Sequence, residues 1–272
     1  MELKALLAVV TAGALVTGCA ATAAEPATAS ASVSSASKSS TKLPFPSTYK
    51  AYPSDNTVIT GVTIFDGEGQ QIDNGMIFMS AGKVVSVGGS DTEIPTDSIV
   101  IDGTGKYVTP GIIDVHSHLG DYPTPSVSAH SDGNEATSPV TPEVWAEHSV
   151  WPQDPGFSRA LVNGGITSLQ ILPGSANLFG GRSVTLKNVQ ARTVQAMKFP
   201  GAPYGMKMAC GENPKRVYGG RNRMPSTRMG SLALNRQTWI NAQDYQKKMK
   251  AAKPPKRNLA METLVGVLEG DI

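Results

Sequence analysis

Short runs of β-branched and other apolar residues, separated by glycine turns, dominate the chain from residue 57 to residue 101. Asp-Gly, Asn-Gly and Gly-Gly pairs separate these runs, which cover residues 58–65, 75–79, 83–87 and 99–101. Runs of this length between tight-turn residues are typical of strands joined in hairpins. The pattern therefore predicts a compact antiparallel β-domain over residues 49–110.

Beyond residue 110 the pattern changes to apolar strands that alternate with helical segments. A long polar loop at residues 121–155 interrupts them, and its prolines include Pro123, Pro125, Pro139 and Pro142. We predict strands at residues 111–119, 164–172, 183–189 and around 204–210, and helices at residues 157–162, 232–252 and 258–269. Gly270 is placed to cap the last helix. Alternating strands and helices of this kind indicate an α/β fold.

The N-terminus has the pattern of an exported protein. A short charged start precedes the apolar run Ala5 to Val16 and then Thr17-Gly18-Cys19. This run is too short to span a bilayer and is typical of a secretory signal peptide. Residues 16–19 resemble a bacterial lipobox, which predicts a signal peptide over residues 1–19 and lipidation of Cys19. The alternative is cleavage in the Ala-rich stretch 20–24, which would leave a soluble exported protein.

An Ala-, Ser- and Thr-rich stretch follows the leader. Residues 20–48 hold almost no large apolar side chains before Leu43, so they cannot bury enough surface to offset their ordering entropy. We expect a disordered linker there. The protein is expected in the periplasm or cell envelope, and the lipidated Cys19 is its only expected attachment to a membrane.

Composition narrows the classes of partner. The 272 residues carry a formal net charge of only +2, so no basic excess points to nucleic acid, and none is expected as a partner. Cys19 and Cys210 are the two cysteines, and a lipidated or removed Cys19 would leave Cys210 without an intrachain partner. We therefore expect no disulfide in the fold.

Two histidines at the end of one predicted strand are candidate metal ligands. His116 and His118 stand at i and i+2, so on a strand both imidazoles point to the same face. A bare pair of this kind more often lies on a surface. Here a Pro110-Gly111 turn, an apolar strand and Asp114 two residues before His116 accompany it, so the segment is a longer and more specific motif than a bare pair.

Lys207 lies between apolar residues in a second strand that could carry chemistry. Burying an ammonium ion is costly, so we expect the pKa of Lys207 to fall and its amine to become neutral. A neutral amine can take up CO2 to form a carbamate, which is an anionic oxygen ligand. The alternative is a side chain whose stem packs while its ammonium reaches solvent.

Other polar residues have weaker signals. His130 and His148 are expected to be solvated imidazoles in the 121–155 loop. Glu212 and Asn213 either orient ligands or form a turn before Pro214. A polar loop after the Lys207 strand holds four arginines that could bind a substrate carboxylate, although solvated surface charge is the expected role for any one of them: Arg216, Arg221, Arg223 and Arg228.

Residues 107–118 resemble the opening strand of the amidohydrolase superfamily of metal-dependent hydrolases. The pattern of helix, Gly-Gly, strand and Pro-Gly-Ser up to residue 175 is similar to its imidazolonepropionase-like branch. The resemblance implies that His116 and His118 bind one or two divalent metals, most plausibly Zn2+, and that Lys207 serves as a carbamylated ligand. The resemblance also implies that later strands supply two more histidines and a catalytic aspartate, which are absent from this sequence, so the catalytic residue is unknown.

The resulting expectation is an α/β fold with a small β-sandwich-like domain followed, at residues 111–272, by the first half of a (β/α)8 TIM-type barrel. A complete barrel needs roughly 250 residues, so this one is expected to be truncated. The implied function is hydrolysis of C–N bonds in small cyclic amides or dipeptide-like substrates, inactive in the truncated chain. A homo-oligomer is a possible state. The alternative is a non-catalytic exported lipoprotein or binding protein built on a degraded barrel.

Overall fold

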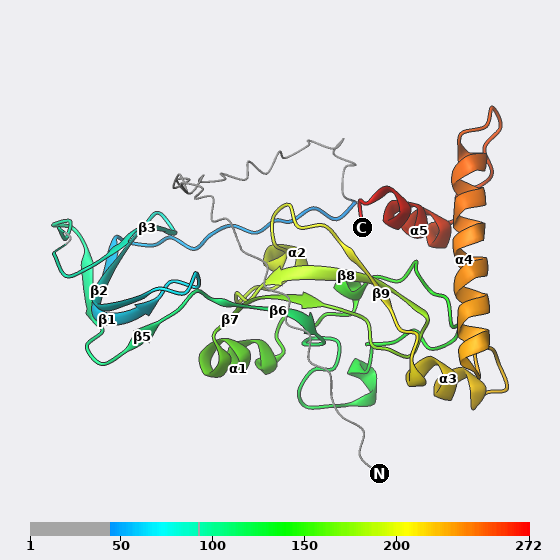
Figure 1. Ribbon diagram of the computed structural model, residues 1–272, viewed down its shortest axis with the longest axis horizontal. Helices are drawn as coiled ribbons and strands as arrows, with labels where there is room; N and C mark the ends of the chain where they lie inside the picture. The colour runs from blue at the N-terminus through cyan, green and yellow to red at the C-terminus, as the bar shows by residue number, and fades with distance from the viewer. Residues whose placement is uncertain (1–43, 92) are drawn as a thin grey trace, which may run out of the picture. The chain divides into compact units, whose positions relative to one another are not determined.

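The computed structural model describes residues 44–91 and 93–272 (Figure 1). All of them fall within one unit of the chain, Lys42–Ile272. The predicted signal peptide, Cys19 and residues 20–43 of the predicted linker lie outside the described residues. No helix in the described ranges is long and apolar enough to cross a membrane.

Five strands form a sheet in the N-terminal part of the described chain. They are β1 (Thr57–Phe65), β2 (Gln71–Ser80), β3 (Lys83–Gly88), β4 (Ile99–Asp102) and β5 (Tyr107–Val108). The sheet order is β3-β2-β1-β4, and β5 also pairs with β1. The β1–β2 and β2–β3 pairs are antiparallel, but β4 and β5 run parallel to β1.

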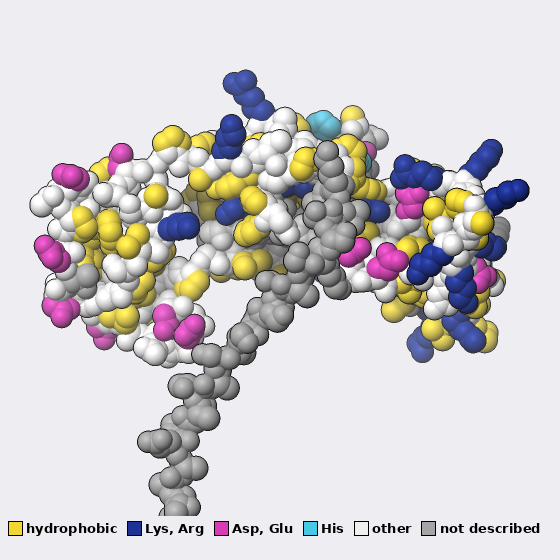
Figure 2. Space-filling view, turned by 90° about the horizontal axis from the view of Figure 1, so that it is seen from above, with side chains coloured by type: hydrophobic (Ala, Val, Ile, Leu, Met, Phe, Trp, Pro, Cys, Tyr) yellow, Lys and Arg dark blue, Asp and Glu magenta, His cyan; other side chains and the backbone are white. Residues whose placement is uncertain are grey.

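The prediction of an entirely antiparallel domain is therefore wrong for β4 and β5. After β3 the next strand, β4, does not pair with β3 in a hairpin. It pairs instead with β1, where Thr57 lies opposite Ile99. The described residues form one sheet here and not the two stacked sheets of a sandwich, and Figure 2 shows apolar side chains open on its surface. They include Val84, Val85, Val87, Ile99, Val100 and Ile101.

A second sheet contains β6 (Ile112–Ser117), β7 (Ile166–Ile171), β8 (Phe179–Lys187) and β9 (Gly205–Met208), in the order β6-β7-β8-β9. Strands β6 and β7 are parallel, whereas β8 is antiparallel to both of its neighbours. A (β/α)8 barrel requires parallel neighbours, so β8 departs from that expectation. Residues 172–178 alone connect β7 to β8, too few for a helical crossover between parallel strands.

Helices lie between and after these strands (Figure 1). They are α1 (Pro155–Gly164), α2 (Val194–Met197), α3 (Glu212–Gly219), α4 (Arg228–Met249) and α5 (Leu259–Glu269), with short 3-10 turns η1 (Ser128–His130) and η2 (Ala146–His148). The α1 helix begins with Asp154 accepting a bond from the Gly156 amide and ends at Gly165 in the left-handed conformation. Gly270 ends α5 in the same conformation, as predicted.

The α3 helix corrects the expectation of a turn and polar loop after the Lys207 strand. Its first turn holds Glu212 and Pro214. A proline is tolerated there because the first amides of a helix have no intrahelical partner. Asn213 and Arg216 lie within this helix, so its regular backbone fixes the direction of their side chains.

The largest hydrophobic core packs around β7 and β8. Leu169, Ile171, Val184 and Leu186 are almost fully buried, together with Phe157 of α1. A second cluster joins β8 to the C-terminal helices through Phe179, Ala242 and Leu264. These two strands therefore anchor the second sheet.

The last residues of the predicted linker contact the folded chain. The Thr48 amide donates to the Gln195 carbonyl at 2.9 Å, and Ser47 Oγ donates to the Lys198 carbonyl at 2.7 Å. Lys198 Nζ in turn donates to the Phe45 carbonyl. Residues 45–48 are thus not part of a free linker.

We expect Leu169→Ala to lower the free energy of unfolding by about 2–5 kcal/mol, because Leu169 is 0 % exposed and its removal leaves a cavity in β7. Urea titration measures the change. Val162→Ala, at a side chain that is 81 % exposed on α1, is the matched control and should stay within about 0.5 kcal/mol. Equal effects of the two substitutions would contradict this account of the core.

Candidate metal centre

The two histidines lie at the C-terminal end of strand β6. His116 lies on the strand and His118 follows directly after its last residue, Ser117. The Asp114 carboxylate accepts a bond from the His116 amide at 3.1 Å. The two rings stand edge to face with their centroids 5.3 Å apart. The i, i+2 spacing has therefore brought the imidazoles together, as the strand pattern predicts.

Lys207 reaches the same place from β9. Its Nζ atom lies 3.3 Å from His116 Nε2, although 91 residues separate the two in sequence. In a flat sheet β6 and β9 would be three strand spacings apart, about 14 Å. The contact therefore requires the second sheet to curve so that both side chains point to its concave side.

The electrostatics around Lys207 match the expectation for a buried amine. Its side chain is only 9 % exposed, and burial lowers the pKa of its ammonium group. In the part of the chain that the structure describes, no carboxylate forms an ion pair with it. The Lys207 charge is the largest cause that lowers the pKa of His116, followed by burial of the imidazole. Both shifts favour neutral groups, which can act as ligands.

A backbone carbonyl orients His118. Its Nδ1 atom lies 2.7 Å from the carbonyl oxygen of Leu172, the residue after β7. When Nδ1 donates to this oxygen, Nε2 keeps its lone pair and can bind a metal. Within the described ranges, no group of three His, Cys, Asp or Glu side chains forms a metal cluster. The described residues thus bring together two imidazoles and one amine, which are three possible ligand groups.

A small cavity of about 270 Å³ opens beside His118. Its walls come from the end of β6, the loop after β7 and the α3 helix, and they include Tyr122, Asn134, Ser175, Asn213 and Arg216. Asn213 Nδ2 donates to Ser175 Oγ at 2.6 Å. Glu212 does not reach this cavity and instead pairs with Arg216 at 3.0 Å on the surface.

The other arginines and histidines named from the sequence have structural contacts elsewhere. Arg221 and Arg223 donate to the carbonyls of Ala136 and Thr137, and Arg228 begins α4. His130 is half-buried against Trp151, at 5.0 Å between ring centroids, so its expected solvation is wrong; His148 is exposed and stacks on Trp145.

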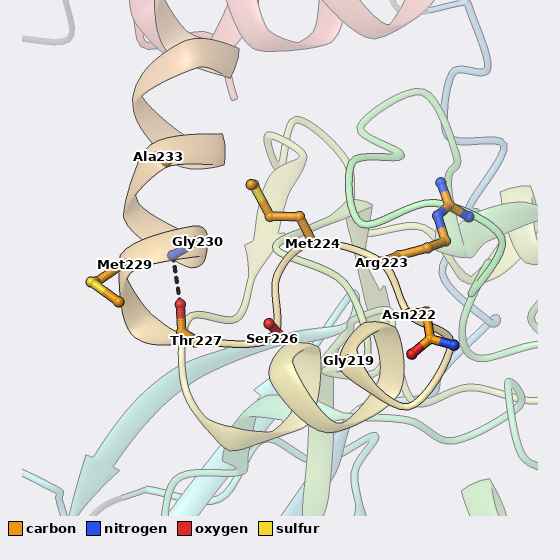
Figure 3. Close-up of a pocket in the computed structure, with 9 residues that line it drawn as sticks. All are labelled: Gly219, Asn222, Arg223, Met224, Ser226, Thr227, Met229, Gly230 and Ala233. Atoms are coloured by element: carbon orange, nitrogen blue, oxygen red, sulfur yellow. Dashed lines mark hydrogen bonds between the residues drawn. The ribbon is translucent and has the colours of Figure 1, made fainter.

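A larger cavity of about 690 Å³ lies where α3 meets α4 (Figure 3). Arg223, Met224 and Met229 are among its lining residues, and the Thr227 hydroxyl caps α4 by accepting a bond from the Gly230 amide. None of the residues that line it also lines the cavity beside His118. The larger of these two cavities is therefore not the one that contains His118.

Sequence reasoning missed Asp121, which lies three residues after His118. Its side chain is 0 % exposed, its Oδ1 atom accepts a bond from Ser149 Oγ at 3.0 Å, and its Oδ2 atom has no hydrogen-bond partner. Burial raises the pKa of this carboxyl to about 7. The only sequence signal was an acidic residue in a loop that follows the His pair.

Known proteins show similarity to this chain, although no family model matches it. Amidohydrolase TasK of Hapsidospora irregularis is 40% identical over 148 residues, which are 51% of this chain and 15% of TasK. An imidazolonepropionase of Alkaliphilus metalliredigens is 42% identical over 52 residues, 18% of this chain and 12% of that enzyme. A solved amidohydrolase from Thermotoga maritima is 38% identical with a TM-score of 0.71, over 78% of this chain and 55% of that structure.

The mixed α/β fold with a curved sheet matches the Thermotoga structure, and the matched relatives are amidohydrolases. These similarities support the amidohydrolase superfamily for this chain, which matches the N-terminal portion of such proteins. It spans about half of the matched structure and a smaller share of the two curated relatives. Members of this superfamily are generally metal-dependent.

Asp121→Asn should raise the free energy of unfolding at neutral pH. A carboxyl whose pKa is higher in the folded than in the unfolded protein stabilises the fold when protonated, and this contribution is lost as the pH rises from about 4 to 7. Between pH 4 and pH 7 the free energy of unfolding of the variant should rise relative to that of the parent by up to about 4 kcal/mol. Urea titrations at a series of pH values measure the difference. A difference that does not change with pH would contradict the assigned pKa.

Proposed function

We propose that His116, His118 and Lys207 form part of the metal site of a hydrolase that acts on C–N bonds in small cyclic amides or dipeptide-like substrates. The contact of 3.3 Å between His116 Nε2 and Lys207 Nζ carries this proposal. It joins two groups that only the curvature of the sheet brings together. Similarity to the amidohydrolase superfamily supports the reaction class.

The donor set fits zinc. Two neutral imidazoles are preferred ligands of Zn2+, and the Leu172 carbonyl fixes the orientation of one of them. When bound, such an ion lowers the pKa of a water molecule and polarises a carbonyl. The protein's part is to aim the His116 and His118 side chains at one point. While Lys207 is charged, its charge lowers the pKa of His116, and desolvation adds to this; desolvation still acts once Lys207 is neutral.

Lys207 would complete this part of the site as a carbamate. Its neutral amine attacks CO2, a C–N bond forms, and the amine loses one proton to solvent. The product is an anionic oxygen ligand on β9. Burial supports this step because it lowers the pKa of Lys207 and raises the fraction of neutral amine.

Arg216 is the arginine that we propose for substrate binding. It lines the cavity beside His118, where its guanidinium is already bonded to Glu212 and Asn213, whereas Arg221 and Arg223 are bonded to backbone carbonyls and do not line this cavity. A guanidinium can hold a carboxylate through two parallel hydrogen bonds. A cavity of about 270 Å³ suits a small molecule, which fits a dipeptide-like or cyclic amide substrate.

We propose further that the chain by itself does not hydrolyse amides. The general base and the remaining ligands would come from a longer chain or a partner copy. Strand β6 pairs only with β7 among the described residues, and its Ile112, Ile113 and Val115 are 52–69% exposed. An unpaired strand edge with exposed apolar side chains favours association, which supports either source.

The protein is proposed to act outside the cytoplasm, anchored through Cys19. Radiolabelled palmitate should be incorporated into the parent chain in a bacterial host, because lipidation requires the Cys19 thiol. Cys19→Ala should abolish the label, and Cys210→Ala should leave it unchanged. Equal labelling of the parent chain and Cys19→Ala would contradict the anchor.

The double variant His116→Ala, His118→Ala should bind zinc at least about tenfold more weakly than the parent, because it removes both imidazole ligands. Plasma mass spectrometry after dialysis against a zinc buffer measures the metal content. The double variant His130→Ala, His148→Ala removes the same number of imidazoles and should retain the parent's content. Equal zinc in all three proteins would sink the proposal.

Lys207 should give a carbamate signal in carbon-13 NMR when the protein is equilibrated with labelled bicarbonate and zinc. Lys207→Met should lose the signal, since Lys207 is the buried amine that contacts His116. Lys83→Met is the control, because Lys83 is an exposed lysine on β3. A spectrum of the parent chain without this signal would contradict the carbamate.

A further inference from the structure

A third cavity, of about 430 Å³, is lined by a cluster of acidic side chains. We call it the acidic cavity, and Asp121, Asp132, Glu135 and Glu143 are among its lining residues. We propose that it binds a protonated organic amine against Asp121. The proposal does not depend on the metal site.

The buried Asp121 carboxylate is the observation that points to a ligand. Its Oδ1 atom is bonded to Ser149 Oγ, but Oδ2 is buried with no hydrogen-bond partner. Buried polar atoms in native proteins are almost always paired, and leaving one unpaired is costly. An N–H donor entering the acidic cavity would supply the partner that Oδ2 lacks.

The charge of the lining favours a cation. Four of its residues carry carboxyl groups, and no lysine or arginine is among them. Cations bonded to residues in or next to the lining are already engaged: Arg182 lies over the Trp145 ring at 4.1 Å, Lys198 is paired with Glu147, and Arg221 donates to the Ala136 carbonyl. Low-dielectric walls concentrate such a negative potential, which raises the local concentration of a cationic ligand.

The shape of the cavity favours an organic amine over a metal ion. In the described ranges no three acidic or histidine side chains converge as metal ligands. A cavity of this volume is also large for one ion, and Val144, Trp145 and Pro173 give it apolar wall. A primary ammonium has three N–H donors on an apolar stem, so it can meet Asp121 and this wall together.

The acidic cavity adjoins the site described above. Asn134 lines both it and the cavity beside His118, and the Asp121 amide donates to the His118 carbonyl at 3.1 Å. The amine could therefore belong to a substrate held by the His pair or to a separate small molecule. Both share the same ammonium chemistry.

Isothermal titration of the full chain with n-butylammonium chloride tests the proposal, with 1-butanol as the neutral match at constant ionic strength. We expect binding of the amine and none of the alcohol. Asp121→Asn should weaken the affinity for the amine about tenfold or more, because it removes one hydrogen bond to a charged group. Equal binding of amine and alcohol, or of amine by parent and variant, would overturn the proposal.

Two further arms complete the experiment. Glu143→Gln changes an exposed carboxylate of the lining, so the proposal can still be tested if Asp121→Asn does not fold. This variant should bind the amine more weakly than the parent but still bind it. Unchanged binding would count against the cavity. Magnesium chloride that binds in place of the amine would also overturn the proposal. Glycylproline that competes with butylammonium supports a substrate amine, and simultaneous binding of both supports a separate amine ligand.

Discussion

The curvature of the second sheet is the constraint on which the candidate site depends. Strands β6 and β9 are its two edges, and His116 and Lys207 meet only if the sheet bends around their side chains. Leu169, Ile171 and Leu186 lie on the two strands between these edges and are fully buried in the core, which holds the middle of the sheet in place. Packing in the middle of the sheet thus sets the chemistry at its edges.

A buried polar network holds the loops around this core. Lys198 Nζ lies 2.6 Å from both Glu147 Oε2 and Tyr204 Oη, and it also donates to the Phe45 carbonyl. Removing one partner of such a buried pair leaves an uncompensated charge, which typically destabilises a protein by about 3–5 kcal/mol. The network therefore joins the loop that covers the site, the β8–β9 connection and the first described residues.

Local pattern predicted most of the elements, because period-two alternation and turn residues act within a few residues. The β1 and β6 strands, the α1 helix and the Gly270 cap follow from such signals. The parallel placement of β4, the reversed β8 and the α3 helix depend on connections and tertiary contacts, which local pattern does not encode. In the site, the i, i+2 spacing placed both histidines, and Lys207 was found only because its apolar neighbours and the family resemblance agreed. Asp121 and Asn134 come from an irregular loop with no periodic signal.

The central claim is that the side chains of His116, His118 and Lys207 converge on one point, where they can bind a metal ion. X-ray absorption at the zinc edge of the zinc-loaded chain tests it most directly, because the spectrum reports the type and distance of the atoms around the metal. The account predicts two imidazole nitrogens per zinc at about 2.0–2.1 Å, with one of them lost in His118→Ala. A shell of oxygen atoms alone, or a spectrum that His118→Ala leaves unchanged, would contradict it.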